Sequence, residues 1–576
     1  MIVSVVMDVH QSLRKRAAYA IGTVLDAAGV GCRFPDALHG DEDIVLSYGA
    51  SACPSMARHR VWIQCPCCPW LLDLESNREH FVRLDQSLRY LDCGERAIPF
   101  WGDVAGGHGD GWAITPPRGK TAACRLRADL FGNVFLHLSR IEEWCITERD
   151  QRQRFEWERS SLGKAGLLSR PVVDEYISAF GDLLQQCCQH ARVPLIRKAL
   201  WPGGEAFAVC LTHDVDRVKK WTAKRILREM LSALCQLTGS PDAAGRCFLS
   251  VVKSVARREN PYWNLDALLE DEDEFGLASS FYFSTERKLR FDPSYAITED
   301  RIRQAIQLLR ARNREVGLHP TYDAFDAYQI LKAEHADFVR ATGFAPRGLR
   351  FHYLRFDERR TLRNADRLGL AYDTTLGYAG AEGFRAGTSL PFHPFDLSSD
   401  EPLQLLEMPL CIMDRTLTEY RGYDAHAAQQ ATRSMWDRVC ACHGLFSVLL
   451  HQACYDVGEY PYLRPWYRAL LSWTRDQEAF CATAEQIADW WVARSAFRLL
   501  EARRDASGSA WRFESAHQLR AIKLLLTVPT LPGTPLIEIL GPLRRMETEE
   551  GRIGLLLGPV QRGQQIRINA SASATG

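Results

Sequence analysis

Strand-like and helix-like segments alternate from about residue 205 to about residue 495 of this 576-residue chain. Short apolar runs such as 207–211 and 446–450 are separated by amphipathic stretches such as 300–312. Strands that alternate with helices form parallel sheets, because each helix returns the chain to the edge of the sheet where the previous strand began. The pattern therefore predicts an α/β fold for this region, either a (β/α) barrel or an open parallel sheet.

The regions on either side of this segment differ from it in pattern. Residues 1 to about 200 also alternate short strands with helices, whereas strand-like runs separated by Gly and Pro follow residue 497. A chain of this length is too long for a single hydrophobic core. We predict an N-terminal α/β domain over 1–200, a barrel domain over 201–497 and a small β-rich appendage over 498–576. The appendage is expected to end in a disordered tail from Asn569.

Charge and hydropathy give no evidence for a nucleic acid or membrane partner. Lys and Arg together number 71, and so do Asp and Glu. Near the N-terminus, Asp8 precedes the basic run Arg14–Arg16, which is the reverse of the charge order in a signal peptide. No apolar stretch approaches the roughly 18 residues that a membrane-spanning helix needs. We therefore expect a cytoplasmic protein with no membrane span and no nucleic acid partner.

Ionisable side chains follow five of the predicted strands. In chain order these are His213, Asp214 and Asp216; His319 and Asp323; Arg350 and His352; Asp373; and His451. Parallel strands end at one edge of the sheet, where reactive side chains gather. Taken singly, a strand-end histidine is more often structural, and the aspartates could cap a helix. Together they form a carboxylate and imidazole set that suits a divalent metal.

Asp214 and Asp216 are two residues apart. On an extended segment, residues at this spacing point to the same side. Both carboxylates can therefore face one cavity, where one would hold metal and the other would handle protons, as metal-assisted hydrolysis requires.

Five segments in this order carry a family resemblance: LTHDVD, EVGLHPTYD, LRFHYLRF, YDTTLGY and LLHQ. They resemble the successive motifs of the polysaccharide deacetylase family (carbohydrate esterase family four, NodB-like), over about residues 205–495. The resemblance implies a distorted (β/α) barrel that hydrolyses N- or O-acetyl groups on sugars. It also implies one divalent metal ion, for which we expect zinc, with cobalt or manganese as alternatives. The preceding region resembles an N-terminal domain that is fused to such proteins and has no established role.

The resemblance also implies a role for each matching position. Asp214 matches the catalytic base, Asp216 and His319 match metal ligands, Arg350 matches the arginine that orients the base, Asp373 matches its acidic partner, and His451 matches the acid that protonates the leaving amine. A backbone N–H near Tyr353 is expected to stabilise the oxyanion.

The second motif departs from the family pattern. Four residues after His319, where typical members have a second metal-binding histidine, this chain has Asp323. The third ligand is therefore open among Asp323, which we favour for its spacing, His352 and His213, or the metal is no longer bound tightly.

Two functions follow from this reading. We expect a metal-dependent deacetylase acting on an N-acetylated polysaccharide, oligosaccharide or glycan precursor. The alternative is a catalytically altered carbohydrate-binding or scaffold protein of a polysaccharide assembly system. The altered motif favours the alternative, while retention of both a base and an acid, Asp214 and His451, favours the enzyme.

Overall fold

The computed structural model describes most of the chain. The described residues are 2–38, 42–49, 59–73, 79, 84–94, 96–104, 110–115, 121–221, 226–227, 231, 260–286, 288–477, 479–504, 508–529, 536–549 and 552–571. No helix within these ranges is both long enough and apolar enough to cross a membrane.

A parallel sheet curled into a half-barrel forms the middle region of the chain. Its strands are β10 (Ala208–Val215), β11 (Ser279–Phe283), β12 (Glu315–Leu318), β13 (Gly348–Leu349), β14 (Tyr372–Asp373), β17 (Leu406–Glu407), β18 (Ile412–Met413) and β19 (Leu445–Leu449). The spatial order is β17-β14-β13-β12-β11-β10-β19-β18, and β20 (Phe480–Cys481) also pairs with β10. In the described part of the chain no pairing joins β17 to β18, so the expected α/β barrel is open at that point.

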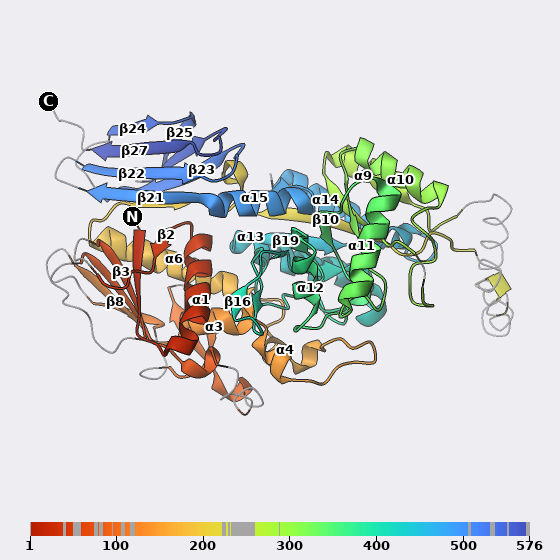
Figure 1. Cartoon of the computed structure of the whole chain (residues 1–576), viewed down its shortest axis with the longest axis horizontal. Helices are drawn as coiled ribbons and strands as arrows, with labels where there is room; N and C mark the ends of the chain where they lie inside the picture. The colour runs from red at the N-terminus through yellow and green to blue at the C-terminus, as the bar shows by residue number, and fades with distance from the viewer. Residues whose placement is uncertain are drawn as a thin grey trace.

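Helices cover the outside of this half-barrel (Figure 1). They are α9 (Leu265–Phe275), α10 (Asp300–Ala311), α11 (Tyr328–Thr342), α12 (Thr361–Arg367), α13 (Ala425–Ala441), α14 (Leu463–Asp476) and α15 (Ala484–Ala496). Helix α10 shows why they pack there: Ile302, Ala305, Ile306 and Leu309 are buried at helical spacing, so one apolar stripe faces the sheet. The first strand is longer than predicted, because β10 runs on to Val215 and holds His213 and Asp214 within it.

The N-terminal unit contains a second, mainly parallel sheet. Its strand order is β2 (Gly31–Arg33), β1 (Ile2–Met7), β3 (Ile44–Tyr48), β4 (Val61–Cys65), β8 (Ala122–Leu126) and β7 (Trp112–Thr115), and only β7 is antiparallel to its neighbour. The chain between β4 and β7 forms a separate two-stranded sheet from β5 (Leu88–Cys93) and β6 (Arg96–Trp101). The helices are α1 (Arg14–Ala27), α3 (Leu130–Leu138), α4 (Ile141–Cys145), α5 (Ser161–Lys164) and α6 (Val172–His190).

The C-terminal strands form two antiparallel four-stranded sheets. One has the order β21 (Phe497–Arg504), β22 (Gly508–Ser515), β27 (Gln565–Ser571), β24 (Leu536–Leu540), and the other β25 (Leu543–Glu549), β26 (Arg552–Leu557), β23 (Ile522–Thr527), β9 (Leu195–Lys198). Strand β9 thus pairs with β23, although it precedes residue 200. Residues 569–571, which the sequence analysis assigned to a disordered tail, lie in β27, because they pair with β22 and β24.

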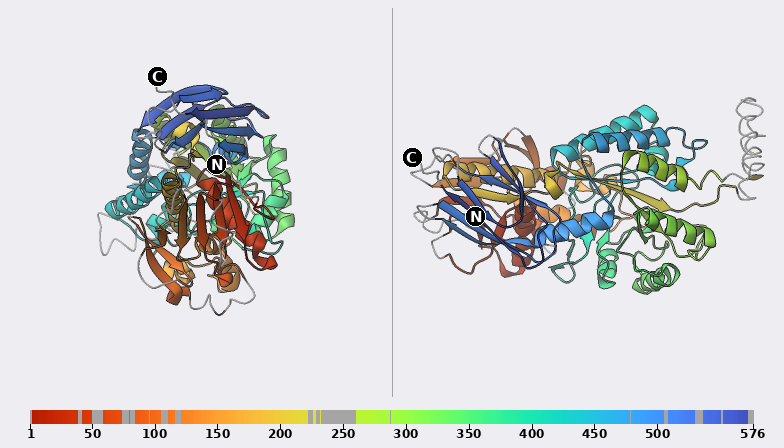
Figure 2. Two further views of the ribbon diagram at one scale, coloured as in Figure 1. Left: turned by 90° about the vertical axis from the view of Figure 1, so that its left-hand side faces the viewer. Right: turned by 90° about the horizontal axis from the view of Figure 1, so that it is seen from above.

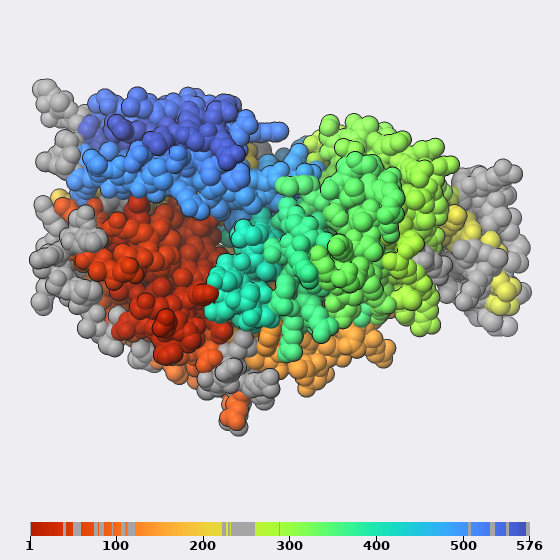
Figure 3. Space-filling model, viewed as in Figure 1, coloured from red at the N-terminus to blue at the C-terminus, as the bar shows by residue number. Residues whose placement is uncertain are grey.

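The three parts of the chain lie against one another. In Figures 1 and 2 the N-terminal and C-terminal sheets occupy one end of the molecule and the half-barrel the other. The orange segment that contains α4 leaves the N-terminal sheet and lies against the barrel, which the space-filling view shows as continuous contact (Figure 3). Its contacts with the barrel include an ion pair between Arg149 and Glu358 at 2.9 Å and a hydrogen bond from Arg355 Nε to the carbonyl of Arg152 at 2.9 Å.

Candidate metal and catalytic site

A cavity of about 310 Å³ lies at the carboxyl edge of the central sheet. Asp214, Asp216, His352 and His451 all line it. Asp214 comes from the end of β10, His352 from the short turn after β13, and His451 from the residues after β19. The structure therefore brings together side chains that lie up to about 240 residues apart, because their strands are parallel and end at one edge.

Two histidines in this site each direct an unprotonated nitrogen toward the same point. His319 Nδ1 lies 2.6 Å from the carbonyl oxygen of Arg350, and His352 Nε2 lies 2.9 Å from that of Phe291. A carbonyl oxygen only accepts hydrogen bonds, so each of these nitrogens carries the proton in the neutral ring. The other two nitrogens, His319 Nε2 and His352 Nδ1, then present lone pairs to each other across 2.8 Å.

Asp216 completes this group. Its Oδ1 lies 3.2 Å from His319 Nε2 and 3.6 Å from His352 Nδ1, yet it is buried and accepts no hydrogen bond of good geometry from the described residues. Burial alone would raise the pKa of Asp216, but the positive charge of the neighbouring imidazoles, when they are protonated, outweighs it and holds that pKa well below the ordinary value. When both rings are neutral, their two lone pairs and this carboxylate repel one another, and either a proton on His319 Nε2 or a metal ion between them relieves the repulsion. Burial would lower the pKa of His319, but the carboxylates of Asp214 and Asp216 raise it above the ordinary value. The donor set fits a divalent metal that takes N and O ligands.

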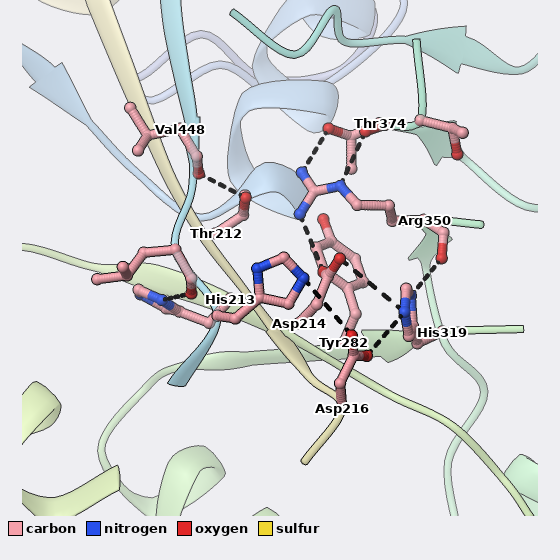
Figure 4. Close-up of polar contacts among 12 residues, drawn as sticks. Thr212, His213, Asp214, Asp216, Tyr282, His319, Arg350, Thr374 and Val448 are labelled. Carbon is pink, nitrogen blue, oxygen red and sulfur yellow. Dashed lines mark hydrogen bonds and ion pairs between the residues drawn. The ribbon is translucent and has the colours of Figure 1, made fainter. Parts of the chain in front are cut away.

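Asp214 is held beside this group by Arg350. Arg350 Nη1 donates to Asp214 Oδ1 at 3.0 Å, while its Nε and Nη2 donate to the carbonyl and hydroxyl of Thr374, both at 2.9 Å (Figure 4). The guanidinium is completely buried, so its charge acts on the carboxylate without competition from water. The carboxylate of Asp214 is thus kept in one orientation with one oxygen toward the cavity group, 3.9 Å from His319 Nε2.

His451 is paired with Asp414, a residue that was not predicted from the sequence. His451 Nδ1 lies 2.8 Å from Asp414 Oδ1, and the backbone N–H of His451 donates to Asp414 Oδ2 at 2.7 Å. Its Nε2 faces the cavity, 3.5 Å from Asp216 Oδ2. Burial would lower the pKa of His451, but the carboxylates of Asp414 and Asp216 raise it above the ordinary value. Asp414 directly follows β18, so its place at a strand end was the available signal.

The structure does not bring the remaining predicted residues into the group. Asp323 is more than half exposed and lies 3.3 Å from Arg355. His213 is fully buried elsewhere, with Nδ1 on the carbonyl of Leu450 and Nε2 on Glu272, both at 2.8 Å. Asp373 accepts hydrogen bonds from the N–H and hydroxyl of Thr375, whereas Arg350 donates hydrogen bonds to the neighbouring residue Thr374.

The backbone beside the cavity is strained at one place. Tyr353 has a φ of +61° and Leu354 a φ of +53°, which side chains with a Cβ rarely adopt. Such residues cost of the order of 1–3 kcal/mol each and gather at functional sites. Here the turn places both His352 and Tyr353 at the cavity.

A protein-family model matches only part of the chain. Residues 38–189 match a family of unknown function, DUF7033. No curated protein matches the sequence.

Among solved structures, one similar chain is a protein of Mycobacterium smegmatis that is classed as a polysaccharide deacetylase (17% identity, TM-score 0.35, covering 54% of this chain and 98% of that one). Another is Puue allantoinase (15% identity, TM-score 0.34, 51% and 92%). A third is a CE4 family pseudoenzyme from Bacillus anthracis (12% identity, TM-score 0.26, 50% and 67%). At these identities and TM-scores, none of them says what this chain does.

Proposed function

We propose that this chain is a metal-dependent deacetylase that hydrolyses N-acetyl, or O-acetyl, groups on a polysaccharide, oligosaccharide or glycan precursor. One observation supports it above the others. A largely buried three-residue donor set, a carboxylate fixed by a buried arginine and a histidine fixed by a buried aspartate lie together at one cavity. These are the parts that hydrolysis of an amide requires: a cation site, a base and an acid.

Asp216, His319 and His352 would hold the metal ion, and zinc suits two imidazoles and a carboxylate best. We take His352, in place of Asp323, as the third ligand because its free nitrogen is directed at the other two while the Asp323 carboxylate is turned to Arg355. When bound, the ion would polarise the acetyl carbonyl and lower the pKa of a water molecule.

Asp214 and His451 would then move the protons. Asp214, held by Arg350, accepts the proton of the attacking water. His451 is protonated more readily than an ordinary histidine, since Asp414 stabilises the imidazolium. Its Nε2 therefore donates a proton to the departing amine, which would otherwise be a very poor leaving group. Acetate and a free amino sugar are the products.

The alternative function, a carbohydrate-binding or scaffold protein, depended on the altered second motif. With His352 as the third ligand, as proposed here, the altered motif no longer favours this alternative; the position of His352 Nδ1, 2.8 Å from His319 Nε2, supports that assignment. A binding protein also needs neither a base nor an acid.

The test is metal analysis of the purified protein together with acetate release from a panel of N-acetylated oligosaccharides. Wild type should contain one divalent ion per chain and release acetate. Asp216→Ala should lose both while its circular dichroism spectrum stays unchanged. Asp323→Ala, which removes a nearby exposed carboxylate, is the matched control and should keep both. A metal-free wild type, or full metal content in Asp216→Ala, would contradict the proposal.

A further inference from the structure

The cavity that holds the candidate site is lined by more arginines than its catalytic groups need. Besides the buried Arg350 behind it, five line the cavity: Arg152, Arg154, Arg217, Arg290 and Arg415. A neutral acetylated sugar would require none of them, since it carries no charge to balance. Some of these arginines already have a carboxylate partner within the protein.

Two of the five are neutralised within the protein. Arg154 forms an ion pair with Asp150 at 2.8 Å, and Arg415 forms one with Glu419. The cavity carboxylate of Asp292 is also satisfied, because it accepts hydrogen bonds from the backbone N–H groups of Lys288 (3.0 Å) and Tyr322 (2.8 Å). Asp214 and Asp216 belong to the site already described. No cavity carboxylate is therefore left for the other three arginines.

Arg152, Arg217 and Arg290 form no ion pair with any carboxylate in the described ranges. The guanidinium of Arg152 lies over the ring of Tyr353, 4.1 Å from its centroid, and that of Arg290 lies 4.5 Å from the ring centroid of Phe291. Stacking on a ring fixes the plane of a guanidinium and leaves its N–H groups free to bind a ligand. Arg217 directly follows the candidate metal ligand Asp216 and is exposed at the cavity.

Arg152 comes from the N-terminal unit, outside the half-barrel. It lies in the turn between α4 and α5, where Asp150 Oδ1 accepts from the backbone N–H groups of Arg152 (2.8 Å) and Arg154 (2.9 Å). Arg355 of the barrel holds the carbonyl of Arg152 in turn. The turn is thus fixed from both sides, so the position of this guanidinium over Tyr353 is built into the fold.

We propose that the substrate of this site carries an anionic group, a phosphate or a carboxylate, that Arg152, Arg217 and Arg290 bind. The inference rests on the proposed function and narrows its substrate class to acidic N-acetylated sugars. Guanidinium groups match the oxygens of phosphate and carboxylate in pairs, which explains arginine at all three positions. The N-terminal unit then acts as a specificity element, since it supplies one of the three positioning residues.

The test is direct binding to the full-length protein, measured by isothermal titration calorimetry so that no turnover is needed. The ligands are di-N-acetylchitobiose (neutral), N-acetylglucosamine 1-phosphate, and a disaccharide of glucuronate and N-acetylglucosamine. The proteins are wild type, Arg152→Gln, Arg217→Gln and a control, Arg340→Gln, in which a largely exposed arginine of α11 is changed. Melting temperatures establish that each variant is folded.

At least one anionic ligand should bind wild type about tenfold or more tightly than the neutral disaccharide. Its affinity should fall roughly 10- to 100-fold in Arg152→Gln and in Arg217→Gln, because each loses charge-assisted hydrogen bonds, and should not change in Arg340→Gln. The preferred anionic ligand distinguishes phosphate from carboxylate. Equal binding of all three ligands, or wild-type affinity in both pocket variants, would overturn the proposal. Either result is independent of acetate release, so failure of the deacetylase proposal would be seen separately.

Discussion

Two buried charged clusters of this molecule are built on opposite principles. Where α4 meets the barrel, Arg385 donates two hydrogen bonds to Glu143, from Nε to Oε1 at 2.9 Å and from Nη2 to Oε2 at 2.6 Å. Both side chains are about 1% exposed. At the cavity, two imidazole lone pairs and the carboxylate of Asp216 converge instead. In the first cluster the two members neutralise each other, while the donor atoms of the second are arranged so that they can hold a cation.

This difference separates a structural role from a functional one. A buried pair whose donors and acceptors match is costly to break, so it serves to hold α4 against the barrel. A group of imidazole and carboxylate donors directed at one point is suited to bind a cation. Substitutions in the two clusters should therefore have opposite effects: loss of stability at the junction, and loss of metal or turnover at the cavity.

The largest effect is expected for Asp214→Asn. Loss of a general base typically costs roughly 100- to 10,000-fold in turnover. In the proposed site Asp216 and the two histidines would hold the metal, so metal content should remain close to that of wild type. Acetate release and metal analysis on the same preparation check both. Near-normal turnover would mean that Asp214 is not the base.

His451→Ala should lower turnover of amide substrates by a similar factor, roughly 100-fold or more. The loss should be much smaller on an activated O-acetyl ester, because that leaving group departs without a full proton. The measurement is the ratio of amide to ester turnover in wild type and variant, with melting temperature as the control. An unchanged ratio would assign His451 a structural role only.

At the junction, Glu143→Ala should destabilise the protein by about 3–5 kcal/mol, because it leaves the buried charge of Arg385 unpaired. Metal content of the folded protein should not change. Urea unfolding measures the loss, with Asp489→Ala as control. That variant breaks the exposed Arg347–Asp489 pair and should cost about 0–1 kcal/mol. Equal losses in the two variants would show that the buried Arg385–Glu143 pair contributes no more to stability than the exposed pair.

Metal titration should distinguish the two candidates for the third ligand. His352→Ala is expected to weaken metal binding by at least about 10- to 100-fold, since the loss of a ligand costs no less than the loss of a residue that orients one. Asp323→Ala should bind metal as wild type does, because its carboxylate faces Arg355. The reverse result would restore Asp323 as the ligand.

The smallest expected effect is on the free energy of unfolding at acidic pH. Burial alone would raise the pKa of Glu143, but Arg385 and neighbouring arginines lower it below the ordinary value. A lowered folded-state pKa contributes stability that is complete above the unfolded pKa of about 4.3 and is lost as pH falls through the folded value. Wild type should therefore lose more free energy of unfolding below about pH 4 than Glu143→Gln. Urea unfolding across acidic pH measures this, and parallel curves would show that Glu143 does not contribute.

Much of the site was predictable from local pattern alone. Apolar runs marked the strands, and each chemically important residue lies at the end of one or follows it, from Asp214 in β10 and Asp216 just after it to His451 after β19. The i, i+2 spacing places both aspartates on one side of an extended strand whatever the rest of the chain does. The parallel α/β sheet followed from the alternation of strands and helices, which is also a local property.

Other features depended on distances that no local pattern contains. Sequence spacing favoured Asp323 as a ligand, but the turn that contains Tyr353 places His352 beside His319 and Asp216. A carbonyl 61 residues away accepts a hydrogen bond from His352 Nε2, which leaves Nδ1 free in the neutral ring. Asp414 becomes the partner of His451 only because β18 and β19 are paired. Arg152 reaches the cavity from the N-terminal unit, some 200 residues before Tyr353. The local sequence determines residue type and position along a strand. The contacts between histidines, carboxylates and arginines form only when the sheet curls and the N-terminal unit packs against it.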